Sequence, residues 1–174
     1  MNLIALLAGT LIIVLFSWFY SIRHGRYHGI PRFFSFESIF ILVLLNYKVW
    51  FRDPLAPLQI ISWILLIMSA YTGIAGIVLL KKVGKPGKNF ENTSVLVKSG
   101  LYRFIRHPLY CSLLLLGTGV MFKNAGTAQL LLGIINLAAI FFTARLEEKE
   151  MVAKFGDAYT DYMKETKMFV PFVV

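Results

Sequence analysis

The sequence predicts an all-α fold, a polytopic bundle of about five transmembrane helices with amphipathic helices after the last span. Hydrophobic residues occupy 57% of the 174 positions, and the mean hydropathy is +0.68, which are both high for a soluble domain. Several apolar stretches also reach the roughly 20 residues that a helix needs to cross the hydrocarbon core. Few residues are left for a separate soluble domain, so we expect functional groups in the loops and at the helix ends.

The first three spans are expected at residues 3–22, 33–50 and 58–80. The first is interpreted as a retained span, because it has neither the basic start nor the small-residue cleavage pattern of a signal peptide. Glu37, near one end of the second span, is expected to find a partner or to extend toward the interface. Gly73 in the third span suits close packing of neighbouring helices.

The second half of the chain is expected to contain a helical hairpin. Residues 81–106 are polar and include several Gly and Pro, which excludes one continuous helix. The fourth and fifth spans are expected at residues 108–122 and 127–144, joined by a tight turn. We therefore divide a single structural domain into residues 1–80, with three spans, and residues 81–174, with the polar loop, the hairpin and the tail.

The tail after the fifth span is expected to be amphipathic and helical, because apolar and aromatic residues recur at helical spacing. Gly156 should interrupt this helix, and Asp157 should cap a second short one. Glu148 and Glu150 are interpreted as part of a solvated helix face. Residues 169–174 are apolar and are expected to pack back on the membrane surface. The helical spacing is that of Met151, Phe155, Tyr159 and Tyr162.

The distribution of charge predicts the topology. Residues 81–106 contain seven Lys or Arg and one acidic residue, and the loop after the first span contains three Arg. The loops after the second and fourth spans contain one basic residue each. The positive-inside rule therefore places both basic loops and the tail in the cytoplasm and the N-terminus outside.

The same pattern limits the classes of partner. The net charge of +9 is attributed to cytoplasmic loops beside anionic lipid, and we expect no nucleic-acid partner. Cys111 is the only cysteine, so no intrachain disulfide and no cysteine metal cluster can form. His24 and His28 are interpreted as interfacial loop residues, and no metal is expected.

The ends of the hairpin carry the residues that could perform chemistry. A two-helix hairpin returns to its starting side, so Arg106 and His107 are expected near Glu147 and Glu148. Pro108 suits the first position of a helix, where unpaired N–H groups and the dipole attract anions. A zwitterionic ligand fits this arrangement, with its carboxylate at the helix start and its ammonium at the Glu. The alternative is structural: Arg106 pairs with Glu147, and His107 only caps the helix.

At these residues the sequence resembles the isoprenylcysteine carboxyl methyltransferase family and its bacterial and archaeal relatives. One matching motif is Leu-Val-Lys-Ser-Gly-Leu-Tyr-Arg-Phe-Ile-Arg-His-Pro-Leu-Tyr at residues 96–110. The second is Glu147-Glu148, followed at the family spacing by Phe-Gly-Asp and two tyrosines. The order of the motifs around a hairpin is specific, and the resemblance runs from Ser94 to the C-terminus. The Arg-His-Pro-x-Tyr part alone also resembles membrane sterol reductases and phospholipid N-methyltransferases.

The resemblance implies S-adenosyl-L-methionine as the cofactor and a lipophilic methyl acceptor that arrives from the bilayer. It also implies that Glu147 binds the amino group of the cofactor. Arg106 and Arg145 are the candidate catalytic residues. By matching positions, the other candidate cofactor-binding residues are Ser94, Val95, Leu96, Val97, Tyr102, His107, Pro108, Leu109 and Tyr110.

The sequence departs from the family pattern in two places. Cys111-Ser112 replaces a glycine found in many relatives, and Thr143 stands where some members carry an arginine proposed to meet the substrate. Arg145 lies two residues later, about 200° around a helix. The expected acceptor is the carboxylate of a prenylcysteine-like or other isoprenoid or lipid molecule, since a carboxylate needs no general base. A phospholipid N-methyltransferase, a nicotinamide-dependent reductase and an inactive membrane protein are the alternatives.

Overall fold

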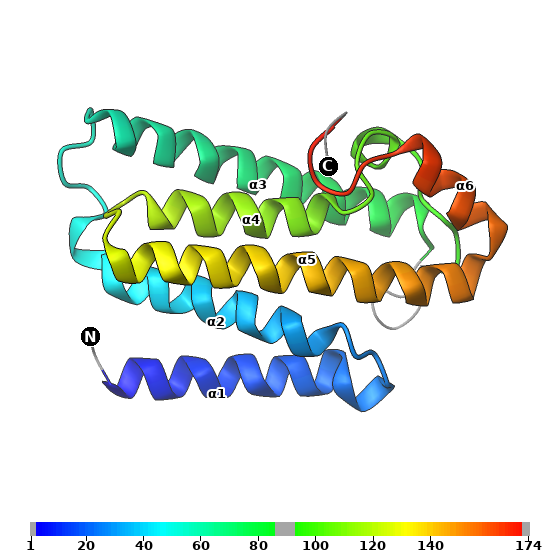
Figure 1. Cartoon of the computed structure of the whole chain (residues 1–174), viewed down its shortest axis with the longest axis horizontal. Coiled ribbons are helices and arrows are strands. Elements are labelled where there is room, and N and C mark those ends of the chain that lie inside the picture. The colour runs from blue at the N-terminus through cyan, green and yellow to red at the C-terminus, as the bar shows by residue number, and fades with distance from the viewer. Residues whose placement is uncertain (1–2, 86–92, 172–174) are drawn as a thin grey trace.

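A computed structural model describes residues 3–85 and 93–171. These residues form a helical bundle without β-strands, apart from one isolated bridge between Ile105 and Lys167. Short 3-10 helices connect some of the α-helices. Figure 1 shows the α-helices α1 (Leu3–Tyr20), α2 (Gly29–Asn46), α3 (Pro57–Val83), α4 (Pro108–Met121), α5 (Thr127–Phe155) and α6 (Asp157–Glu165).

Among the described residues, four helical segments are long and apolar enough to cross a membrane, namely those that contain α1, α2, α3 and α5. The expected fourth span is present as α4, but it has only 14 residues. At about 1.5 Å per residue it measures about 21 Å, less than the hydrocarbon thickness of about 30 Å. It packs against α2, α3 and α5, so its ends are sheltered by longer neighbours. The short α4 leaves room beyond its N-terminus for the site described below.

Two side-chain hydrogen bonds show how α4 is held in the bundle. Ser62 of α3 donates from Oγ to the carbonyl of Gly119 at 2.7 Å. Asn46 of α2 donates from Nδ2 to the carbonyl of Val120, also at 2.7 Å. Both side chains are buried, and within a bilayer such interhelical bonds contribute about 0.6 kcal/mol each on average. The bundle therefore packs with polar as well as apolar contacts.

Helix α5 continues well past residue 144, where the fifth span was expected to end. Its 29 residues measure about 43 Å, so the last turns extend beyond a hydrocarbon layer of about 30 Å. Gly156, with a positive φ of 57°, separates α5 from α6, and only glycine adopts such a backbone at low cost. The predicted interruption at Gly156 is confirmed. The prediction of Asp157 as the cap was wrong, since Asp157 is the first residue of α6 and Gly156 occupies the cap.

The connections alternate between the two ends of the bundle as the topology prediction requires. The α1–α2 connection, the described part of the segment between α3 and α4, and α6 lie at the right-hand end in Figure 1. The α2–α3 and α4–α5 connections lie at the other end. The basic loops and the tail therefore share one end, and the assignment of that end to the cytoplasm stays a prediction.

Polar side chains of α1, α2 and α5 have specific partners. Glu37 accepts a hydrogen bond from Thr10 Oγ1 at 2.6 Å, so the expectation of a partner is confirmed. His28 lies in the connection between α1 and α2, as expected, but it is fully buried and its Nδ1 lies 2.9 Å from Glu150. The expectation that Glu150 belongs to a solvated face was therefore wrong. The sequence gives no sign that the α1–α2 connection folds against α5.

Candidate active site

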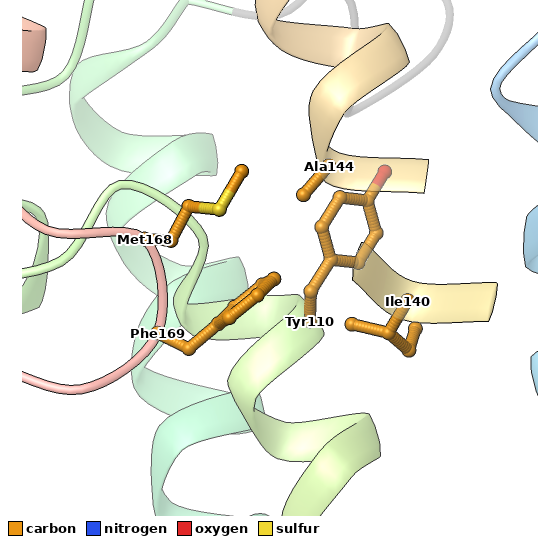
Figure 2. Packing of buried hydrophobic residues seen from close by; sticks show 5 residues of the cluster. All are labelled: Tyr110, Ile140, Ala144, Met168 and Phe169. Atoms are coloured by element: carbon orange, nitrogen blue, oxygen red, sulfur yellow. The ribbon is translucent and has the colours of Figure 1, made fainter. Parts of the chain in front are cut away.

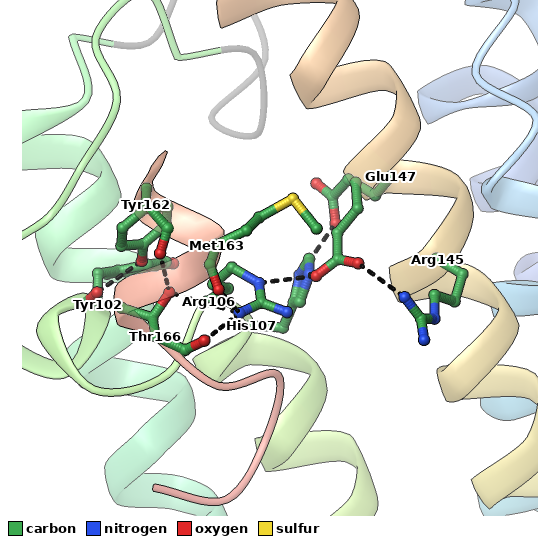
Figure 3. A network of polar contacts seen from close by, with 9 residues as sticks. Tyr102, Arg106, His107, Arg145, Glu147, Tyr162, Met163 and Thr166 are labelled. Carbon is green, nitrogen blue, oxygen red and sulfur yellow. Dashed lines mark hydrogen bonds and ion pairs between the residues drawn. The ribbon is translucent and has the colours of Figure 1, made fainter. Parts of the chain in front are cut away.

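The start of α4 and the last third of α5 meet around His107, as the hairpin argument predicted. His107 Nδ1 lies 3.6 Å from Glu147 Oε2, and its Nε2 lies 3.4 Å from Glu148 Oε1. The imidazole is only 6% exposed, and Figure 3 shows it facing Glu147. The two motifs that are about forty positions apart in the sequence thus form one site.

The two carboxylates determine the charge of His107. Burial disfavours the imidazolium, but the facing Glu147 and Glu148 stabilise it more strongly and raise the pKa of His107 above its ordinary value of 6.5. Neither imidazole nitrogen has good hydrogen-bond geometry with the carboxylates at these separations. Among the described residues Nε2 has no hydrogen-bond partner. The site therefore presents a buried imidazole whose protonation the two carboxylates favour.

Arg106 pairs with Glu148, at 2.7 Å between Nε and Oε1. Its Nη1 also donates to the carbonyls of Met163, at 3.3 Å, and Thr166, at the C-terminal side of α6. Glu148 is only 3% exposed, so its expected place on a solvated face was wrong. The reason is that the last turns of α5 are covered by the segment before α4 and by α6. The structural alternative named above expected Arg106 to pair with Glu147. In the structure Arg106 pairs with Glu148 instead.

The tail folds over the site instead of spreading on the membrane surface. The backbone N–H of Arg106 donates to the Lys167 carbonyl at 2.8 Å, and that of His107 donates to the Met168 carbonyl at 3.1 Å. Phe169 is buried, with its ring 6.2 Å from that of His107. Residues 169–174 were expected to pack back on the membrane surface. This expectation was wrong at Phe169, and residues 172–174 lie outside the described residues. Figure 2 shows the resulting cluster of Tyr110, Ile140, Ala144, Met168 and Phe169.

Three tyrosines line the same region and bind α6 to the segment before α4. The Tyr162 hydroxyl donates to the Tyr102 carbonyl at 2.5 Å, and the rings of Tyr159 and Tyr162 pack edge to face at 5.8 Å. Burial raises the pKa of Tyr102, and the charge of Glu147 adds to this effect. Burial also raises the pKa values of Tyr159 and Tyr162. All three phenols therefore stay protonated at neutral pH, with O–H groups for hydrogen bonding.

These residues surround a cavity of about 270 Å³, near the lower end of the sizes typical for small-molecule sites. The side chains that line the cavity differ in polarity according to the element from which they come. Polar side chains come mainly from the segment before α4 and from α5 and α6, whereas α1, α2 and α3 contribute mainly apolar ones. We call Phe16, Phe36, Gly73 and Ile77 the apolar wall. The polar side is formed by Thr93, Tyr102, Arg106, His107, Glu147, Tyr159 and Tyr162.

Most of the predicted site residues line this cavity, and four do not. Ser94 donates to the Lys85 carbonyl at 2.9 Å, on the exposed side of the loop. Val95 is exposed, and Pro108 is buried beneath the cavity as the first residue of α4. The side chain of Arg145 is 58% exposed and lies 3.8 Å from Glu148 Oε2 on the outer face of α5. The predicted residues that line the cavity are Leu96, Val97, Tyr102, Arg106, His107, Leu109, Tyr110 and Glu147.

Sequence reasoning missed the contribution of the first three helices. Arg32 was counted as a loop residue, but it is the fourth residue of α2, is 3% exposed and lines the cavity. Phe36 lies one helical turn further along the same face, a spacing of four that could have indicated a shared surface. No pattern in the sequence indicated that the cavity would also be lined by Phe16, Gly73 and Ile77. Among the described residues, no group of three or more His, Cys, Asp or Glu side chains could hold a metal.

The polar side of the cavity suits the S-adenosylmethionine predicted from the sequence. This cofactor carries an ammonium, a carboxylate and a flat adenine. Glu147 offers the negative charge, while the imidazole of His107 and the first-turn N–H groups of α4 offer donors. The tyrosine rings offer flat faces. The fold and the cavity thus define a class: polytopic helical membrane proteins with a small-molecule site at one end of the bundle.

Comparison with known proteins identifies the family. The model of the isoprenylcysteine carboxyl methyltransferase (ICMT) family matches residues 63–153, just over half of the chain. The chain therefore belongs to this family. The match begins within α3, upstream of the motifs recognised in the sequence.

Individual relatives carry two kinds of name. A methanethiol S-methyltransferase from a Pseudomonas strain is 38% identical over 71 residues, which cover 41% of this chain and 26% of that protein. The protein-S-isoprenylcysteine O-methyltransferase of Rattus norvegicus is 29% identical over 170 residues, covering 82% of this chain and 57% of that protein. The protein-S-isoprenylcysteine O-methyltransferase A of Arabidopsis thaliana is 35% identical over 89 residues, which cover 49% of this chain and 44% of that protein. The chain thus spans less than two thirds of the length of each of these relatives.

Proposed function

We propose that the protein is an S-adenosylmethionine-dependent methyltransferase that acts on a lipophilic acceptor dissolved in the membrane. The observation that carries the proposal is the placement of His107 beside Glu147 and Glu148, in a cavity that the apolar wall also lines. Family membership supports the same reaction class. The charged side suits a nucleotide-derived zwitterion, and the apolar wall suits a molecule that partitions into lipid.

On the polar side, Glu147 holds the ammonium of the cofactor. His107, whose protonated form the two carboxylates favour, and the start of α4 hold its carboxylate. Arg106 acts as a positioning residue: through Glu148 and the carbonyls near the end of α6 it fixes the cover of the cavity. Arg145 lies on the outer face, away from the cavity, in a place suited to an interface anchor.

When bound, S-adenosylmethionine would supply a methyl group on a positively charged sulfur. Its transfer to a carboxylate oxygen would form a C–O bond, break the C–S bond and leave a thioether and an ester. No proton moves in this reaction. The protein's share is to align the two reactants and exclude water, which the tail and α6 do by covering the site. A carboxylate acceptor needs no general base, so the raised pKa of His107, which its two facing carboxylates cause against the effect of burial, does not hinder this reaction. This favours a carboxylate over an ammonium acceptor.

A thiol is the second candidate acceptor, favoured by the names of the methanethiol S-methyltransferase relatives. A thiol ionises near pH 8.5, much closer to neutrality than an amine. Methylation of a thiol therefore requires little general-base catalysis. The topology that accompanies the proposal places the N-terminus outside and the site at the cytoplasmic face, where the cofactor is available.

The test is cofactor binding followed by acceptor screening, with the full chain in nanodiscs. Calorimetry should give saturable binding of S-adenosylmethionine and none of NADPH. Methyl transfer should then be measured with N-acetyl-S-farnesylcysteine, decanethiol and phosphatidylethanolamine. Preference for the carboxylate supports the proposal, and preference for the thiol selects the second candidate. Absence of cofactor heat at millimolar concentration with folded protein would refute both.

A further inference from the structure

An open depression lies on the outer face of α5, outside the cavity of the candidate active site. We call it the outer depression. It has a volume of about 310 Å³ and is lined by Arg145, Glu148, Lys149 and Val152 of α5 and by Met163 of α6. Arg145 and Lys149 are exposed, and their spacing of four residues brings them together on one helix face. The proposed cofactor site uses neither of these two cations.

The position of the two cations along α5 places them at the edge of the bilayer. Helix α5 begins at Thr127, at the end of the bundle opposite to α6 (Figure 1). Arg145 lies about 27 Å further along the helix axis and Lys149 about 33 Å, whereas the hydrocarbon core is about 30 Å thick. Both side chains therefore reach the level at which lipid phosphates lie.

The outer depression also contains the Glu148 carboxylate, but the charge of this group is compensated from inside the bundle. Arg106 Nε lies 2.7 Å from Glu148 Oε1, and His107 Nε2 lies 3.4 Å from the same oxygen. Arg145 Nη1 is 3.8 Å from Oε2, which is longer than a hydrogen bond. Arg145 and Lys149 thus give the outer depression a positive character, which attracts an anion.

An apolar surface adjoins the two cations on the side of the hydrocarbon core. Phe141 and Phe142, one turn of α5 before Arg145, are 38% and 60% exposed. The guanidinium carbon of Arg145 lies 5.4 Å from the centre of the Phe141 ring. Cations at one level and exposed aromatic rings directly below them match the phosphate and the acyl chains of a phospholipid. A soluble phosphate compound would leave the apolar part of this surface uncovered.

We infer that an anionic phospholipid binds in the outer depression, with its phosphate between Arg145 and Lys149, and that it ties α6 to the bilayer surface. An anionic headgroup is favoured because it brings no positive group to a site with two cations. The link to α6 is Met163, which lines the depression and whose carbonyl accepts a hydrogen bond from Arg106 at 3.3 Å. The lipid site does not depend on the proposed function.

The experiment measures lipid binding to the full chain in detergent by native mass spectrometry, with dioleoylphosphatidylglycerol as the probe. A Lys or Arg beside anionic lipid contributes a factor of about five to the affinity. Arg145→Gln should therefore weaken binding of the first phosphatidylglycerol about fivefold, and the double variant Arg145→Gln/Lys149→Gln about twenty-five-fold. Dioleoylphosphatidylcholine should bind more weakly to the wild type and should distinguish little between wild type and double variant.

Two control variants keep the result interpretable. Arg145→Lys/Lys149→Arg keeps both charges and should retain most of the affinity for phosphatidylglycerol. Lys81→Gln/Lys82→Gln removes two exposed cations from the last turn of α3, at the same end of the bundle, and should bind the lipid within twofold of the wild type. Thermal unfolding shows whether each variant is folded.

Three outcomes would overturn the lipid site. The first is equal affinity of the wild type and the double glutamine variant for phosphatidylglycerol. The second is an equal loss in Lys81→Gln/Lys82→Gln, which would indicate general charge attraction. The third is binding of glycerol 3-phosphate, a phosphate headgroup without acyl chains, as tightly as the lipid, which would indicate a soluble ligand.

Hydrogen exchange tests the link to α6. Phosphatidylglycerol should slow amide exchange in α6 of the wild type and should have no such effect in the double glutamine variant. If the lipid binds through the two cations while exchange in α6 stays unchanged, the tie between α6 and the bilayer surface is wrong.

Discussion

Replacement of Glu147 by glutamine is the most direct perturbation of the proposed cofactor site. The substitution keeps the size of the side chain and removes one negative charge from the polar side of the cavity. The Glu147 side chain is 19% exposed, so water screens its charge only partly. A charge-assisted hydrogen bond in such a place contributes about 1.5–3 kcal/mol. Glu147→Gln should therefore weaken S-adenosylmethionine binding by about tenfold to 150-fold.

The matched control is Glu150→Gln, which makes the same chemical change on nearly the same face of α5. Glu150 pairs with His28 and does not line the cavity, so its variant should bind the cofactor within twofold of the wild type. Calorimetry in nanodiscs measures both affinities, and thermal unfolding reports whether each protein is folded. If the two variants bind equally well, or Glu147→Gln binds as tightly as the wild type, the assignment of Glu147 is wrong.

Three other predictions follow from the same geometry. Arg106→Met and Glu148→Gln should each destabilise the protein by about 3 kcal/mol, because each removes the nearest charged partner of a buried charge. The double variant should lose less than the sum, as a thermal-unfolding cycle would show. The stabilising contribution of protonated His107 should be fully present below about pH 6.5 and should fade as the pH rises through the raised pKa of the folded state. His107→Gln should remove this pH dependence of the unfolding temperature. Arg145→Gln should bind the cofactor within twofold of the wild type, since the side chain is outside the cavity. A tenfold loss of affinity would show that Arg145 belongs to the cofactor site.

The features that the sequence predicted well depend on periodicity and on topology. Apolar stretches locate helices directly, and a hairpin must return its ends to one side, so the approach of His107 to Glu147 followed without any coordinates. The length of α4 was also read correctly from its flanking Pro108 and the turn at residues 123–126. Family motifs then named most of the residues that line the polar side.

The features that it missed depend on contacts between distant segments. The hairpin argument placed Arg106 near Glu147 and Glu148, but nothing in the residues around Glu148 shows that its side chain is buried, so it was placed on a solvated face. The same holds for the pair of His28 with Glu150. Arg32 was assigned to a loop because positive charge usually marks one, whereas here α2 begins three residues earlier. The apolar residues 169–174 show no periodicity from which a packing partner could be predicted. Phe169 was therefore placed on the membrane surface with the rest of this run.

The central claim is that the hairpin of α4 and α5 forms one cofactor site between His107 and Glu147. An experimental structure with bound S-adenosylhomocysteine in nanodiscs tests it most directly. The account predicts the amino group of the ligand against the Glu147 carboxylate, its carboxylate at His107 and the start of α4, and its sulfur facing the apolar wall. A ligand on the outer face of α5 beside Arg145, or at the opposite end of the bundle, would contradict it.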